Sequence, residues 1–281
     1  MKTRKNHRRA GLIFFLLICL SIFFLFYDSN TRLVTDTYSL YFDNLPPSFD
    51  GYRIVQLSDI HAAVLGQNNA TLLDAVRKAQ PDIIVITGDL IDSKDDLAIV
   101  SPLVQALTGI APVYFVTGNH EWRSGALNNL LSVLTARGVT VFRNSFVRLT
   151  VGEESIVLAG VDDPNGPADM KTPEALMSEI RAQVGDPFVI LLAHRNDALA
   201  RYASLNIDLV LSGHAHGGLV RLPLTDGLIG PSREWFPKYT SGVYTDGATQ
   251  MLVSRGIGNR TGYPRLLNNP ELVVAILRRT K

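Results

Sequence analysis

Short apolar runs that end in a polar side chain able to bind a metal constrain the fold of this chain more than any other feature. Five such runs occupy residues 53–57, 83–86, 113–116, 188–192 and 209–211. Segments with the periodicity of amphipathic helices lie between them, at residues 70–80, 125–137 and 173–184. This alternation is typical of α/β domains, in which the loops after the strands converge on one crevice. We therefore expect the polar residues after the runs to form one cluster.

The side chains in question share one position, directly after a strand-like run. They are Asp59 and His61, Asp89, Asn119 and His120, His194, and His214 and His216. Each has an ordinary explanation when taken alone: a turn with a surface histidine, a helix N-cap, or a core histidine bonded to the backbone. These explanations would have to coincide at five successive strand ends. The joint pattern therefore favours one shared metal site.

Nitrogen and oxygen are the ligand atoms available to such a site, because the single cysteine, Cys19, lies in the first apolar run. Imidazoles and hard oxygens suit Mn, Fe, Zn or Co. Two such cations about 3.5–4 Å apart can neutralise a phosphate ester, supply a bound hydroxide and stabilise the transition state. Asp89 could bridge them with its two oxygens, and Asn119 offers a neutral oxygen. We expect hydrolysis of a phosphomonoester, a phosphodiester or a pyrophosphate at a dinuclear divalent metal centre.

The blocks SDIH, GDLID, GNHE, AH and GHAH, in this order from residue 58 to residue 216, resemble the signature of the calcineurin-like metallophosphoesterase superfamily. The resemblance implies two mixed β-sheets packed as a sandwich with flanking helices. It places Asp59, His61, Asp89 and His216 on one metal, and Asp89, Asn119, His194 and His214 on the other. It also implies that His120 is the general acid and that Asp92 orients it.

A closer resemblance is to the bacterial membrane-associated or exported branch labelled YaeI/YkuE-like. It rests on the sequence of residues 213–222, 237–242, 253–258 and 264–271. That branch commonly has His-x-Pro-Asp where this chain has His194-Arg195-Asn196-Asp197. The ligand histidine is kept, so metal binding is expected to be retained, whereas the contact of this loop with substrate could differ.

Two further groups of side chains lie in these branch motifs or close to them. Three arginines could bind phosphate oxygens, although solvated surface arginines are more common: Arg221, Arg255 and Arg265. Aromatic residues in the loop at 230–242 could enter a bilayer or hold a lipid tail, the alternative being an ordinary ordered loop: Trp235, Phe236 and Tyr239. Neither group is assigned a role from the sequence.

Residues 11–27 carry no charge and follow a basic stretch, which is typical of a membrane anchor. A spanning helix needs roughly 17 apolar residues or more, and no small-residue cleavage site follows the run. The preceding lysines and arginines place the N-terminus in the cytosol and the rest of the chain outside it. A buried core helix is one alternative. A twin-arginine export signal is another, because Arg8 and Arg9 directly precede the run.

The expected domain organisation is a basic cytosolic N-terminus at 1–10, an anchor at 11–27, a linker at 28–47 and one metallophosphoesterase domain at 48–281. The formal net charge of +1 gives no field that would attract nucleic acid, and no protein partner is indicated. The expected partners are the membrane and a phosphorylated small-molecule or lipid-linked substrate. Two alternatives remain open for the function: a lipid-directed pyrophosphatase at the membrane, and a catalytically silent scaffold that binds metal.

Overall fold

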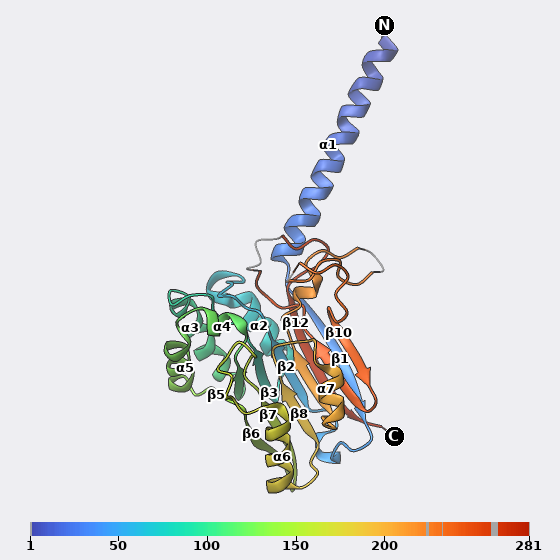
Figure 1. Cartoon of the computed structure of the whole chain (residues 1–281). Helices are drawn as coiled ribbons and strands as arrows, with labels where there is room; N and C mark the ends of the chain where they lie inside the picture. Colours follow the sequence, from blue (N-terminus) through green and yellow to red (C-terminus); the bar gives the residue numbers. More distant parts are fainter. Residues whose placement is uncertain (1, 223–224, 232, 260–263, 281) are drawn as a thin grey trace.

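Two six-stranded sheets packed face to face form the body of the protein (Figure 1). The computed structural model describes residues 2–222, 225–231, 233–259 and 264–280, so Met1 and Lys281, the outer bounds of the expected domains, lie outside it. The first sheet has the order β1 (Val34–Phe42), β12 (Glu271–Arg279), β2 (Arg53–Leu57), β3 (Ile83–Thr87), β4 (Val113–Val116) and β5 (Thr140–Val141). The second has the order β10 (Gly242–Asp246), β11 (Thr249–Val253), β9 (Leu209–Ser212), β8 (Val189–Leu192), β7 (Glu154–Gly160) and β6 (Ser145–Val151).

Both sheets are mixed, as expected. In the first, β2 to β5 run parallel and β12 runs antiparallel to β2. In the second, β7, β8, β9 and β11 run parallel, while the edge strands β6 and β10 run antiparallel to their neighbours. Strands β6 and β7 form a hairpin. The predicted sandwich of two mixed sheets is therefore confirmed.

Helices cover the outer face of each sheet. α2 (Ala70–Ala79), α3 (Leu97–Thr108) and α5 (Leu127–Ala136) pack on the first sheet, and α6 (Pro173–Val184) and α7 (Leu199–Ser204) on the second. The three segments predicted to be helical correspond to α2, α5 and α6. The sequence did not suggest α3, because Pro102 in its middle lacks a backbone donor and ordinarily argues against a helix.

The alternation of side chains along each strand builds separate core layers. In β3, Ile84 and Ile86 pack against the helices, while Ile83 and Val85 face the other sheet. Because both faces of the central strands are buried, these strands are continuously apolar rather than alternating. Polar side chains can enter this arrangement where the strands end.

The N-terminal helix α1 (Lys2–Thr31) projects away from the domain (Figure 1). Among the described residues, one helical stretch, Gly11–Thr31, is long and apolar enough to cross a membrane. The apolar residues 11–27 of this stretch are all exposed, so the alternative of a core helix is wrong.

The structure differs from the linker expected at 28–47. Helix α1 continues to Thr31, and Val34 begins β1, which pairs with β12 over its whole length. The burial of β1 alternates along most of its length, as in a strand at the edge of a sheet. The short helix η1 (Pro47–Phe49) then leads into β2. The polar composition of this segment therefore reflects an exposed strand face rather than a free connection.

Candidate metal centre

The loops that follow the strands bend sharply at the residues expected to bind metal. Five of the seven adopt the left-handed backbone conformation, with φ of 49° at Asp59, 48° at His61, 52° at Asp89, 66° at His214 and 47° at His216. Residues with a Cβ seldom adopt this conformation, which costs about 1–2 kcal/mol each. Backbone hydrogen bonds between loops hold it, including Asp59 N to Gly88 O at 3.1 Å and His61 N to Asp89 O at 2.9 Å. These bonds join the loops that follow β2 and β3.

Two glycines let these loops approach one another closely. A Cβ on Gly118 would collide with the Asp89 carboxylate, and a Cβ on Gly213 would collide with the side chains of Ser58 and Asp59. Close approach explains why both loops begin with glycine.

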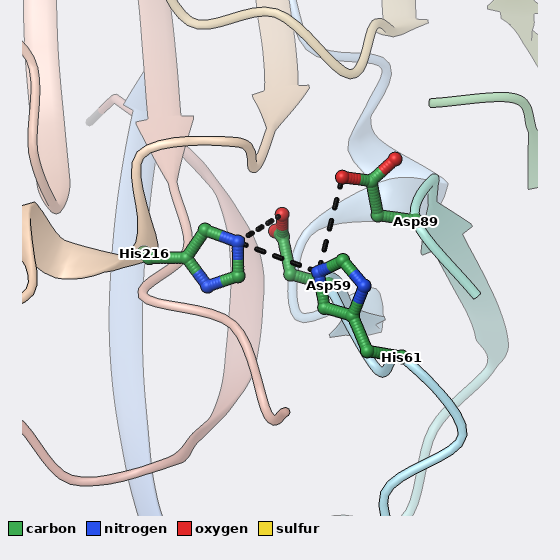
Figure 2. A group of neighbouring side chains, drawn as sticks. All are labelled: Asp59, His61, Asp89 and His216. Atoms are coloured by element: carbon green, nitrogen blue, oxygen red, sulfur yellow. Dashed lines mark hydrogen bonds and ion pairs between the residues drawn. The ribbon is translucent and has the colours of Figure 1, made fainter. Parts of the chain in front are cut away.

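The first cluster consists of Asp59, His61, Asp89 and His216, and all four residues are buried. Figure 2 shows their side chains turned toward one another. His216 Nε2 lies 3.4 Å from Asp59 Oδ1 and 3.4 Å from His61 Nε2, and His61 Nε2 lies 3.9 Å from Asp89 Oδ2. One ligand atom from each residue falls within 4.8 Å of the others. Carboxylate and imidazole groups from both sheets therefore surround one point.

The second cluster consists of Asp89, His194 and His214, again within 4.8 Å of one another. His194 Nε2 lies 3.3 Å from Asp89 Oδ2 and 3.2 Å from Asn119 Oδ1. His214 Nδ1 lies 3.2 Å from His194 Nε2. Asp89 therefore belongs to both clusters, and Asn119 lies against the second.

His120 and Asp92 lie beside the first cluster. The Nδ1 atom of His120 is in close hydrogen-bonding contact with Asp92 Oδ1, and His61 Nδ1 lies 3.2 Å from the same carboxylate. The His120 side chain is 18% exposed, in contrast to the fully buried ligands around it. Arg123, which the sequence did not suggest, places Nη2 2.8 Å from His120 Nε2. The structure thus brings all nine residues expected from the sequence into one site.

The donor set fits two divalent cations. Imidazole nitrogens face each other in two pairs, at 3.4 Å in His61–His216 and at 3.2 Å in His194–His214. The two nitrogens of each pair could bind the same cation. Nitrogen and oxygen donors without thiolate suit divalent transition metals. The backbone N–H of His214 donates to Asp59 Oδ2 at 3.0 Å, which fixes the direction of that carboxylate. The residues present therefore match a dinuclear site that shares Asp89.

Burial and charge shift the protonation of the site in opposite directions. Burial alone would raise the pKa of Asp89, but the nearby His194, His61 and His120 outweigh it and lower the pKa. Burial likewise disfavours the charged form of His194, yet attraction to Asp89 raises its pKa to about 10. Burial, together with the charges of His194 and Arg195, lowers the pKa of His214 to about 3. Asp89 and His194 therefore favour each other's charged form across 3.3 Å.

Glu121 fixes the loops around the bridging carboxylate. It is fully buried, and its carboxylate accepts hydrogen bonds from the backbone N–H groups of Asp89, Leu90, Ile91 and Gly118 at 2.6–3.2 Å. Burial raises the pKa of Glu121, and repulsion from Asp89 raises it further. Its carboxylate therefore joins the loops after β3 and β4.

Asp163 and Arg195 support the second cluster from outside. Arg195 Nε donates to Asp163 Oδ2 at 2.7 Å, and Arg195 Nη1 lies 2.9 Å from His214 Nε2. Asp163 was missed, although the signal was present: Asp162 and Asp163 follow an apolar run just as the other site residues do.

The three arginines of the branch motifs contact protein groups. Arg255 pairs with Asp36 and Glu271. Arg221 donates to Ser241 Oγ at 2.9 Å and to a backbone carbonyl. Arg265 is buried and donates to the carbonyls of residues 255 and 258. These contacts give each arginine a structural role.

Comparison with known proteins identifies the family. Residues 52–218 match the calcineurin-like phosphoesterase family, which covers more than half of the chain. The protein belongs to this family. It is therefore a hydrolase of phosphate esters, and the resemblance seen in its sequence motifs is confirmed.

Proteins with similar sequences support the assignment to the YaeI/YkuE-like branch. The chain is 34% identical to the uncharacterized metallophosphoesterase YkuE of Bacillus subtilis, over 84% of this chain and 82% of that protein. It is 26% identical to the phosphodiesterase YaeI of Escherichia coli, over 86% and 87%. A Bos taurus transmembrane protein with a metallophosphoesterase domain is 34% identical over 78% of this chain, which spans about half (52%) of that longer protein.

Proposed function

We propose that this phosphoesterase hydrolyses a phosphomonoester, a phosphodiester or a pyrophosphate at a dinuclear divalent metal centre bridged by Asp89, with His120 as the proton donor. The carrying observation is that Asp89 belongs to both buried clusters. Two divalent cations bound there would supply the nucleophile and neutralise the charge of the ester. Asp59, His61 and His216 would complete one site, and Asn119, His194 and His214 the other.

The geometry around His120 suits proton donation. Asp92 accepts the hydrogen bond from Nδ1 of His120, which fixes the tautomer and directs Nε2 away from Asp92. In the imidazolium form Nε2 also carries a proton, and it is this proton that would pass to the leaving oxygen and leave His120 neutral. The guanidinium of Arg123 lies beside Nε2, where it would hydrogen-bond a phosphate oxygen of the bound ester.

A metal titration combined with a substrate screen tests this proposal. The purified full chain would be loaded with Mn, Zn, Fe or Co, its bound metal counted, and its activity measured on monoesters, diesters and diphosphates. Two ions per chain together with hydrolysis are expected. Two ions without hydrolysis of any ester would favour the silent scaffold, and a single ion per chain would overturn the bridged site.

We further propose that α1 anchors the enzyme in a membrane, with the N-terminus in the cytosol and the catalytic domain on the other side. The exposed apolar length of the helix and the basic residues before it support this arrangement. The name of the bovine relative supports membrane association as well.

A further inference from the structure

The polar end of α1 is bonded directly to the catalytic domain. Asn30 forms a reciprocal pair with the backbone of Arg265, accepting from its N–H at 3.2 Å and donating to its carbonyl at 2.9 Å. Leu267 N donates to Ser29 Oγ at 2.8 Å, and Asn269 Nδ2 donates to the Asp28 carbonyl at 2.7 Å. These polar residues directly follow the apolar run of α1, so the domain begins where the span would leave the hydrocarbon.

A row of neighbouring backbone segments leads from this joint to an aromatic tip. Leu266, in the segment bonded to α1, pairs with Val220. Val220 accepts from Leu228 N at 2.8 Å, and Leu228 in turn accepts from Phe236 N at 2.9 Å. Adjacent segments of this kind lie roughly 5 Å apart, so the row extends about 15 Å from the base of α1. Figure 1 shows these orange segments at the end of the domain from which α1 departs.

The tip of the row exposes two large aromatic side chains. Trp235 is 69% exposed and Phe236 72%, the highest values among large apolar residues of the described part of the domain after β1 begins. The hydrogen bond of Phe236 and the Ile229–Trp235 bridge hold the tip in place. Full burial of such a side chain is favourable by about 1.5–3 kcal/mol. Two exposed aromatic side chains held in place therefore favour an apolar surface that would cover them.

A lipid surface fits this tip better than a protein surface does. Each aromatic residue buries roughly 150–250 Å², so the pair offers at most about 500 Å², below the roughly 800 Å² per partner of a stable protein interface. Aromatic side chains are enriched where a bilayer meets water. The row also connects the tip to the helix that would cross that bilayer.

We propose that Trp235 and Phe236 insert into the interfacial region of the bilayer in which α1 is anchored. The inference rests on the proposed anchoring. The domain then contacts the membrane at two places, the end of α1 and the tip formed by Trp235 and Phe236. The first segment of the row, which carries Leu266, also contacts the metal-binding loop, because Asn268 Nδ2 donates to the His216 carbonyl at 2.7 Å. The membrane contact is therefore continuous with the loop that carries a candidate metal ligand.

Tryptophan quenching in vesicles tests the insertion. The chain has two tryptophans, so Trp122→Phe leaves Trp235 as the single reporter. The full-length variant would be placed in vesicles made with lipids brominated on acyl carbons close to the headgroup. We expect loss of most Trp235 emission relative to unbrominated vesicles. The matched control, Trp235→Phe, retains Trp122 beside Thr117 in the domain and should keep its emission.

Two further measurements separate this inference from the proposed anchoring. Alkaline carbonate extraction of the same vesicles reports α1 alone: release of the protein would overturn the anchoring. Retention of the protein with unchanged Trp235 emission would overturn only the insertion. Oligomeric state in detergent would be measured for Trp235→Ser combined with Phe236→Ser. Dissociation of an oligomer by these substitutions would show that the tip binds a second copy instead of lipid.

Discussion

At the scale of single residues, the strained backbone and the chemistry of the site coincide. Five of the six residues that form the two clusters, all except His194, have a left-handed backbone. Such strain persists only where the surroundings fix it. Here the fixing groups are interloop backbone hydrogen bonds and the Glu121 carboxylate. These groups hold the loops that carry the carboxylate and imidazole donors.

Replacing the bridging carboxylate tests its shared position. Asp89→Asn removes one formal charge from both clusters, whereas Asn119→Ala removes a neutral oxygen from one. We expect Asp89→Asn to lose far more metal than Asn119→Ala when both are dialysed and their metal content is measured. Equal metal content in wild type and Asp89→Asn would contradict a bridge.

The acid role of His120 predicts a dependence on the leaving group. An alkoxide leaves poorly without a proton, whereas p-nitrophenolate leaves unaided. His120→Ala should therefore slow alkyl esters by about 10²–10⁴ and p-nitrophenyl esters much less. Asp92→Asn should show a milder form of the same pattern, because it would only misorient the imidazole. The measurement is kcat on both ester types, with metal content as the control. Equal losses on both would remove His120 from this role.

Glu271 predicts a dependence of stability on pH. Burial raises the pKa of Glu271 to about 7 from an ordinary value near 4.5, and the neighbouring Arg255 lowers it less than burial raises it; Asp36 and Tyr38 also face the group. A carboxyl whose pKa is raised by folding favours the folded state fully below pH 4.5, and this contribution is lost as the pH rises to 7.

The measurement for Glu271 is the free energy of unfolding by urea at both pH values. The wild type should lose about 3 kcal/mol more than Glu271→Gln between pH 4.5 and 7, at about 1.4 kcal/mol per pKa unit. Glutamine is a suitable control because it retains the size of the side chain and does not titrate. Parallel pH dependence in the two proteins would show that the carboxyl keeps an ordinary pKa.

At the scale of elements, the loops after β3 and β4 act together through one side chain. Glu121→Ala would leave four buried backbone N–H groups without their acceptor and should lower the free energy of unfolding by at least about 4 kcal/mol, since each costs about 1–3 kcal/mol. Glu121→Gln keeps one acceptor oxygen and should lose less. Urea unfolding of both variants measures the difference. Similar stability of Glu121→Ala and wild type would show that water replaces the carboxylate.

Strand ends were predictable from the sequence because the transition from a buried run to an ionisable residue is abrupt. Asp59, Asp89 and His194 illustrate this transition. Helix α3 was not predictable, because tertiary packing of its buried leucines and valines compensates for Pro102. Strand β1 resembled a linker because its exposed face is polar. The contact of Arg195 with His214 also depends on tertiary structure, which no spacing in the sequence reveals.

At the scale of the whole molecule, the charges that precede the apolar part of α1 predict how the chain would be oriented in a membrane. Five lysines and arginines precede the span, which favours a cytosolic N-terminus. A reporter that functions only outside the cytosol, fused after Lys281, is therefore expected to be active. The control is a reporter that functions only in the cytosol, fused at the same place. Activity of the cytosolic reporter would reverse the orientation, and recovery of a shortened soluble form would indicate cleavage.

The direct joint between α1 and the domain sets the working distance of the enzyme. Helix α1 ends at Thr31 and β1 begins at Val34. Hydrogen bonds also join residues 28–30 to residues 265–269 of the domain. Such a joint provides no tether on which the domain could swing. With α1 in a bilayer, the catalytic centre stays at one height above it and searches by lateral diffusion. The rate of turnover would then depend on the number of substrate molecules per unit area of that membrane. Substrate in a neighbouring membrane would not contribute.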